Sequence, residues 1–221
     1  MTSTSPASSE NGRIVWIDCE MTGLDTVADA LVEVAAVVTD AELNVLGDGV
    51  NVVIAPPAEA IEQMDPFVVE MHTRSGLIDE LAGGMTMAAA QELVLDYVRT
   101  WVPEAGKAPL AGNTVGMDKM FLERDMPELM AHLHYRVIDV SSLKELARRW
   151  YPRIYFNSPE KHGGHRALAD ILESIDELRY YRAAMLVPPP GPATAAVREI
   201  SAEIARTSVT AAHLPTGPVG P

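Results

Sequence analysis

The order of the predicted elements indicates an α/β fold, in which a mixed sheet carries helices on both faces. Three apolar segments rich in β-branched residues come first, and two further short apolar segments alternate with segments of helical periodicity after them. The chain has 221 residues, of which 48% are hydrophobic, so it can form one domain with a sizeable core and additional tails.

Five strands are expected from short apolar runs that end at glycine, proline or polar residues. The first begins at Ile14 and carries Asp18 and Glu20 at its end, and Pro56-Pro57 close the third. The remaining strands are expected at residues 31–39, 43–54, 107–113 and 135–140.

The helices are expected between and after these strands, where apolar residues recur at helical spacing. Ser142 and Glu145 have the spacing of a capping box, which predicts that a helix opens at this serine. The other helical patterns are short helices within residues 59–84 and longer ones at residues 85–101, 117–125 and 166–185.

The composition changes at both ends of the chain. Residues 1–11 are predicted to be disordered, residues 12–186 to form the folded domain, and residues 187–221 to form a flexible Pro/Ala-rich tail with a short helix near 195–206. The start of the chain lacks the apolar core of a signal peptide, and no apolar run reaches transmembrane length. The single cysteine, Cys19, excludes an intrachain disulfide. We therefore expect a soluble, cytoplasmic protein without membrane association.

The formal net charge of −14 restricts the possible substrates. A long nucleic-acid footprint normally requires a basic face, so this charge argues against one. It is compatible with a short substrate whose phosphates are held by metal ions and one or two arginines.

Asp18 and Glu20 are the most informative pair in the sequence. Side chains two positions apart on a strand lie on the same face, so these carboxylates should lie side by side at the end of a buried strand. They repel each other there unless a cation neutralises them, which predicts a divalent metal site. The simpler alternative is that both acids project into solvent, and further acids are needed to decide.

Three more residues complete a recognisable pattern. Asp118 follows a strand-to-helix turn at residues 112–116, and His165 and Asp170 follow the Gly163-Gly164 pair, which predicts a mobile loop. Each residue also has an ordinary interpretation, as a helix-start carboxylate, a surface histidine or a solvated helix face.

Together these residues match a two-metal phosphodiester hydrolase, with two Mg²⁺ or Mn²⁺ ions about 3.5–4 Å apart. Hard carboxylate oxygens favour these ions over zinc. A histidine with a pKa near its reference value of roughly 6.5 can accept the proton of the attacking water at neutral pH.

The sequence resembles the DEDDh exonuclease superfamily and, more narrowly, its oligoribonuclease family, over about residues 13–186. The generic four-acid pattern is moderately specific, whereas the longer strings are highly specific. The segments that carry the resemblance are WIDCEMTGLD at 16–25, GNTVGMD at 112–118, HYR at 134–136, SLKELARRW at 142–150 and HRALAD at 165–170.

The resemblance implies an RNase H-like fold and a homodimer. The implied activity degrades very short RNA, chiefly dinucleotides and including pGpG, from the 3′ end to 5′-mononucleotides, without a long nucleic-acid track. It further implies that His165 is the general base and that the metals are held by Asp18, Glu20, Asp118 and Asp170.

The resemblance also implies a set of substrate-binding residues. Leu24 would wedge between the two bases, and Phe67 would stack on a base where known members carry Trp, keeping much of the stacking energy. Thr114 replaces a Ser of the family and retains its hydroxyl. The residues implied to line the nucleotide and cap its 5′ phosphate are His72, Thr114, Arg136 and Ser141. Tyr135 and Arg136 would act across the interface of the homodimer.

Three alternatives stay open at this point. The first is another exonuclease of the same superfamily, such as a DNA proofreading subunit or a tRNA-trimming enzyme. The second is a catalytically silent binding module, which the complete set of five catalytic positions disfavours. The third is a zinc site built on His132, His134, His162 and His165, which lacks any cysteine ligand.

Overall fold

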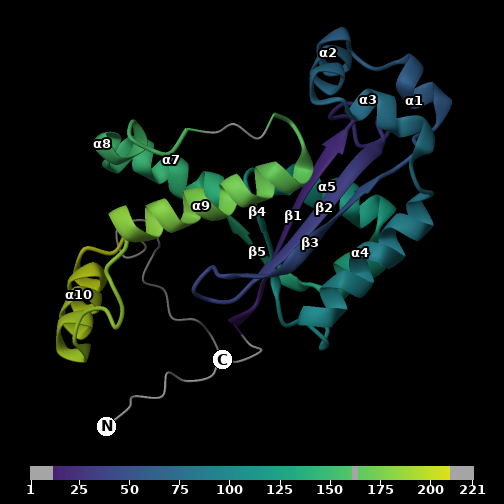
Figure 1. Cartoon of the computed structure of the whole chain (residues 1–221). Helices are drawn as coiled ribbons and strands as arrows, with labels where there is room; N and C mark the ends of the chain where they lie inside the picture. The colour runs from purple at the N-terminus through teal and green to yellow at the C-terminus, as the bar shows by residue number, and fades with distance from the viewer. Residues whose placement is uncertain (1–11, 161–163, 210–221) are drawn as a thin grey trace, which may run out of the picture. The chain divides into compact units, whose positions relative to one another are not determined.

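The computed structural model describes residues 12–160 and 164–209 (Figure 1). The chain divides into two compact units, Met1–Ala184 and Met185–Pro221. The predicted disorder of residues 1–11, the start of the loop at residues 161–163 and the end of the tail at residues 210–221 lie outside the described residues.

The first unit is built on a mixed five-stranded sheet in the order β3-β2-β1-β4-β5, which confirms the predicted fold class. The first three strands form an antiparallel meander, and β4 and β5 extend the sheet in parallel with β1. The strands are β1 (Ile14–Met21), β2 (Leu31–Thr39), β3 (Val45–Val53), β4 (Pro109–Gly112) and β5 (His134–Asp139).

Helices cover both faces of this sheet, and α4 and α9 lie on opposite sides of it (Figure 1). The helical elements before β4 are α1 (Ala58–Glu62), α2 (Pro66–Ser75), α3 (Leu77–Glu80), the 3₁₀ turn η2 (Leu81–Gly83) and α4 (Met87–Trp101). Those after β4 are α5 (Gly116–Asp125), α6 (Pro127–His132), α7 (Val140–Trp150), α8 (Pro152–Tyr155) and α9 (Ala167–Met185).

The alternation of β1 separates the core from the site. Val15, Ile17 and Cys19 pack into a buried cluster with residues of α4 and α5, such as Val94 and Phe121. The intervening side chains of β1, including Asp18 and Glu20, point to the opposite face because successive strand residues alternate. One face of the central strand thus anchors the fold while the other presents carboxylates.

The predicted capping box of Ser142 and Glu145 is wrong. The helix α7 begins at Val140, directly after β5, and its N-cap is Asp139, whose carboxylate accepts a hydrogen bond from the Ser141 amide. Glu145 instead forms ion pairs with Arg148 and Arg149. The strand passes into the helix without a connecting loop, so the last strand residue provides the cap.

The described part of the second unit contains the helix α10 (Thr194–Arg206), in agreement with the short helix expected near 195–206. The flexibility of the remaining tail stays a prediction. Among all the residues that the structure describes, no helix is both long and apolar enough to span a membrane.

The packing of α5 against β1 makes a stability prediction. Phe121 is fully buried in the core, whereas the neighbouring Met120 is half-exposed. Because truncation of a buried aromatic leaves a cavity, we expect Phe121→Ala to lower the free energy of unfolding by about 3–5 kcal/mol, measured by urea denaturation. Met120→Ala should change it by less than about 0.5 kcal/mol. Similar losses in both variants would contradict this assignment of the core.

Candidate active site

The carboxyl end of β1 brings Asp18, Glu20 and Asp118 together. Asp118 lies in the first turn of α5, and its Oδ1 accepts a hydrogen bond of 3.0 Å from the amide of Cys19. The strand β4 runs parallel to β1 and leads into α5. The carboxyl end of β1 and the start of α5 therefore lie at the same edge of the sheet. Carboxyl ends of parallel strands are where ligands bind in α/β folds.

The fourth acid and the histidine come from the start of α9. Ligand atoms of Glu20, His165 and Asp170 all lie within 4.8 Å of one another. Glu20 is buried, Asp170 is partly buried and His165 is exposed. The structure therefore brings the predicted histidine to the predicted acids across about 150 residues of chain.

Burial and mutual repulsion raise the pKa values of these acids. Desolvation, followed by repulsion from Asp118 and Asp170, raises the pKa of Asp18 to about 9. Desolvation and then Asp170 likewise raise the pKa of Glu20 to about 8. The pKa of Asp118 rises to about 6 through desolvation, which hydrogen bonds such as that from Cys19 partly offset.

This donor set fits divalent cations. The pKa values of Asp18, Glu20 and Asp118 are raised because these acids are desolvated and lack a counter-charge, which a bound cation supplies. Their hard oxygens, like those of Asp170, suit Mg²⁺ or Mn²⁺. The residues that could hold such ions are Asp18, Glu20, Asp118 and Asp170, of which Glu20 and Asp170 have ligand atoms within 4.8 Å of each other and of His165.

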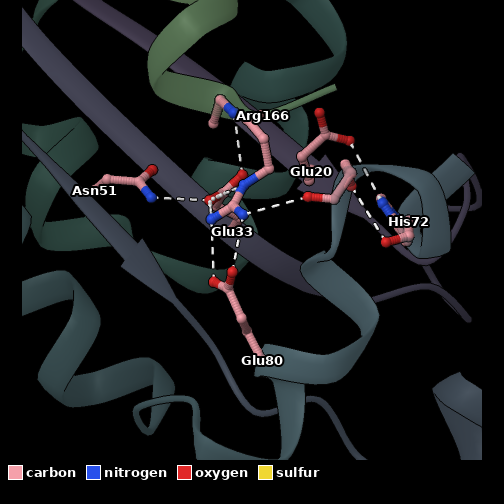
Figure 2. A network of polar contacts seen from close by, with 8 residues as sticks. Glu20, Glu33, Asn51, His72, Glu80 and Arg166 are labelled. Atoms are coloured by element: carbon pink, nitrogen blue, oxygen red, sulfur yellow. Dashed lines mark hydrogen bonds and ion pairs between the residues drawn. The ribbon is translucent and has the colours of Figure 1, made fainter. Parts of the chain in front are cut away.

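His72 is placed differently from the other predicted substrate-binding residues. Its side chain is fully buried in α2, with Nε2 2.9 Å from the carbonyl oxygen of Met21 and Nδ1 4.0 Å from Glu20 Oε2 (Figure 2). The ring thus lies behind a carboxylate of the cluster, away from solvent. Its contact with a nucleotide stays a prediction.

Leu24 and Phe67 are large apolar side chains left in solvent, with exposed fractions of 69% and 72%. Leu24 lies on a loop after β1 that is closed by the Thr22 hydroxyl, which donates to Asp29 Oδ1 and accepts from the Ala30 amide. Phe67 lies at the start of α2 and shares with His165 the lining of a small pocket of about 100 Å³. Both positions are compatible with base contacts.

Thr114 and Ser141 meet at the carboxyl ends of β4 and β5. Their hydroxyl oxygens are 3.1 Å apart, and Ser141 Oγ also donates to Asn113 Oδ1. A single oxygen of Asp139 accepts the amide hydrogens of Thr114, at 3.1 Å, and of Ser141, at 2.9 Å. Thr114 has a φ of 55°, a strained value for a β-branched residue of the kind that clusters at functional sites.

Tyr135 and Arg136 lie earlier on β5, which is an edge strand of the sheet. The guanidinium of Arg136 lies 5.4 Å from the centre of the Tyr135 ring, and both side chains are exposed. Their action on a second subunit stays a prediction.

Sequence reasoning missed several residues that organise the site, namely Asp139, Asn113, Glu33 and Arg166. Asp139 could have been found, because an aspartate at the end of a strand and two residues before a helical serine is an N-cap signal. Glu33 gave no such signal, because the sequence around a single acid in an apolar strand does not indicate which distant residue it pairs with.

The described histidines do not form the alternative zinc site. His132 is buried, with Nε2 2.7 Å from the Val102 carbonyl oxygen, and His134 Nδ1 accepts from the Arg136 amide. Over residues 12–160 and 164–209, the one group of at least three His, Cys, Asp or Glu side chains with ligand atoms all within 4.8 Å of one another is Glu20, His165 and Asp170, which contains a single histidine. His162 lies outside the described residues.

Comparison with known proteins extends these observations. The family described as Exonuclease matches residues 15–178. Relatives named oligoribonuclease are 66% identical over 194 residues in Streptomyces griseus, covering 88% of this chain and 96% of the relative, and 62% identical over 190 residues in Cutibacterium acnes, covering 86% and 94%.

Solved structures support the same fold. The zinc-bound E. coli ExoI–ssDNA complex aligns with a TM-score of 0.61 at 17% identity, and exonuclease I from Methylocaldum szegediense aligns with a TM-score of 0.59 at 20% identity. Each alignment covers 79% of this chain and 41% of the other, so the chain spans less than half the length of those proteins.

The fold and the family match define an exonuclease with an RNase H-like fold, which is a phosphodiester hydrolase. Within that class, the chain belongs to the oligoribonuclease family and is a 3′–5′ exoribonuclease. The predicted family and enzyme class are confirmed, and the alternative of a catalytically silent binding module is wrong.

The raised pKa values make a prediction for the metal-free protein. The folded state binds protons more tightly than an unfolded chain, whose carboxyl pKa values are about 4, so the free energy of unfolding should fall as the pH rises from about 4 to 9. Denaturation in a chelator at pH 6 and pH 8 measures this loss, and added Mn²⁺ should restore more stability at pH 8.

The matched variant is Asp18→Asn, which removes the carboxylate whose pKa rises most among these acids. We expect it to be more stable than the wild type at pH 8 without metal and to gain less from Mn²⁺. A pH dependence identical to that of the wild type would show that this cluster is not electrostatically strained.

Proposed function

We propose that the enzyme hydrolyses very short RNA, chiefly dinucleotides, to 5′-mononucleotides, with two Mg²⁺ or Mn²⁺ ions and His165 as general base. The observation that supports this most is the group of Glu20, Asp170 and His165 at the carboxyl end of β1, together with the electrostatic coupling of Asp18 to Asp118, Asp170 and Glu20. The family membership supports the choice of short RNA, since its members are named oligoribonuclease.

The carboxylates Asp18, Glu20, Asp118 and Asp170 would hold the ions. Bound there, divalent ions supply a nucleophilic water at neutral pH and neutralise charge on the phosphate and the leaving 3′ oxygen. With ions bound, these carboxylates would hold their charge in a fixed arrangement, so little reorganisation would be needed during reaction.

His165 is suited to proton transfer by its place at the edge of the cluster. It is exposed, so it can receive a proton from water and release it to solvent, and it lies within reach of the acids that would hold the ions. The shared pocket with Phe67 would bring the stacked 3′ base and the reacting phosphate to the same histidine.

The hydroxyls of Thr114 and Ser141 support a cap for the 5′ phosphate. They are held at 3.1 Å from each other and are donors of the kind that bind phosphate. Arg136 would complete the cap with a bidentate contact, given from a second subunit together with Tyr135. Leu24 would separate the two bases, so a site closed at both ends would accommodate two nucleotides.

This arrangement makes a homodimer part of the proposal, because the exposed Tyr135–Arg136 pair would serve the partner's site. It also includes pGpG among the substrates, since a dinucleotide with a 5′ phosphate satisfies every contact. A cytoplasmic location follows from this substrate class and the absence of disulfides.

The direct test is hydrolysis of 5′-labelled RNAs of two to ten nucleotides with Mg²⁺ or Mn²⁺. We expect the dinucleotide to be cleaved fastest, because only its 5′ phosphate reaches the cap. Asp18→Asn should reduce kcat by at least about 10³-fold, which excludes a contaminating nuclease. Equal or faster cleavage of the longer RNAs would instead indicate a general exonuclease, including the tRNA-trimming alternative, and would refute the cap.

Arg136 provides a separate prediction about chain length. Losing a hydrogen-bonded charge pair with the phosphate should lower kcat/KM for the dinucleotide by about 10–100-fold. The same Arg136→Ala change should affect ten-nucleotide RNA little, so the preference for the dinucleotide collapses. Arg148→Ala is the control, because Arg148 is an exposed arginine of α7 that pairs with Glu145. Loss of the same factor on both RNAs would show that Arg136 does not read the 5′ end.

A further inference from the structure

The segment that carries His165 needs an anchor. His165 has a φ of 59°, in the left-handed region, which is strained for a non-glycine residue unless surrounding contacts fix it. Its own side chain is exposed, so burial does not fix it. The contacts that hold this segment must therefore come from the residues that follow it.

Arg166, the next residue, is bound by two carboxylates from distant parts of the chain (Figure 2). Its Nε and Nη2 donate to Glu33 Oε1 on β2, at 3.0 Å and 2.8 Å. Its Nη1 and Nη2 donate to the two oxygens of Glu80 on α3, at 2.9 Å and 3.0 Å. Each nitrogen of the guanidinium thus has a carboxylate partner, and the fork geometry fixes the plane of the group.

Glu33 binds the backbone that follows His165 as well as the side chain of Arg166. Its side chain is fully buried, and its Oε2 accepts the amide hydrogen of Ala167, the first residue of α9, at 3.0 Å. Its Oε1 also accepts from Asn51 Nδ2 at 2.8 Å. A buried carboxylate is tolerated only when it is fully paired, and the partners of Glu33 are Asn51 and the two residues that follow His165.

The geometry points to a specific role: Glu33, Arg166 and Glu80 form a clamp that positions His165 for proton transfer. This inference rests on the proposed role of His165 as general base. The three clamp residues do not contact substrate in it, so they are positioning residues. The clamp also fixes the backbone of Asp170, whose amide donates to the Arg166 carbonyl at 3.1 Å.

Glu80 is the member to test, because it is half-exposed and its loss leaves the pair between the buried Glu33 and Arg166 in place. We expect Glu80→Ala to lower kcat about 10-fold while KM changes less than about 2-fold, because small displacements of a catalytic group cost rate. Asp79→Ala is the control, since Asp79 is an exposed acid on the same helix. Glu80→Asp should restore part of the rate.

A double-mutant cycle with His165→Ala separates positioning from general destabilisation. If the clamp acts through His165, Glu80→Ala should cause no further loss of kcat in the His165→Ala background. The same 10-fold loss in both backgrounds would overturn the proposal. The cycle uses whichever RNA length the wild type cleaves fastest, so a failure of the dinucleotide preference leaves this test intact.

Hydrogen exchange gives a readout that does not depend on activity. In full-length protein, Glu80→Ala should increase amide exchange at residues 164–168, while Asp79→Ala should not. Unchanged exchange in Glu80→Ala would refute the clamp whether or not the enzyme acts on dinucleotides. Increased exchange combined with unchanged kcat would confirm the anchoring but refute its connection to His165.

Discussion

Repulsion between buried carboxylates at the end of β1 is the constraint on which the rest of this structure depends. The fold provides the burial, because the other face of β1 packs into the core and leaves Asp18 and Glu20 to share the opposite face. Burial raises the pKa of both groups, and Asp118 and Asp170 raise it further. The free energy of the fold thus opposes the charge state in which these acids would hold cations, so a divalent cation would couple stability to activity.

The positively charged side chain of Arg166 is paired outside the carboxylate cluster. Desolvation and the neighbouring acids raise the pKa of Glu20, and the charge of Arg166 offsets this only in part. The hydrogen bonds of Arg166 go to Glu33 and Glu80, outside the carboxylate cluster. Because its donors are satisfied there, the clamp offsets the buried charge of Glu33 without occupying the place of a metal ion. A positive side chain placed among the four acids would compete with divalent ions for their oxygens. Because Arg166 is paired instead with Glu33 on β2, the strand next to β1, the four acids stay available to such ions.

The sequence was sufficient where one local rule decided the outcome. Strand alternation predicted that Asp18 and Glu20 share a face, and the turn before Asp118 predicted its place at a helix start. It was insufficient where a residue's role depends on a partner far along the chain, as for Glu33. Local rules also failed where two of them competed: a capping box at Ser142 and an aspartate cap at Asp139 were both possible, and the direct passage of β5 into α7 decided for Asp139.

Asp139 also explains how an acidic protein could select a short polyanion. With a net charge of −14, the chain cannot gain affinity from a broad basic surface, so recognition must rest on few and well-oriented donors. Asp139 fixes two backbone amides with a single oxygen and thereby sets the Thr114 and Ser141 hydroxyls next to each other. In the proposed function, such a pair would bind one terminal phosphate and would not contact the phosphates of a longer chain. Length selection would then follow from the lack of further positive charge as much as from the cap itself.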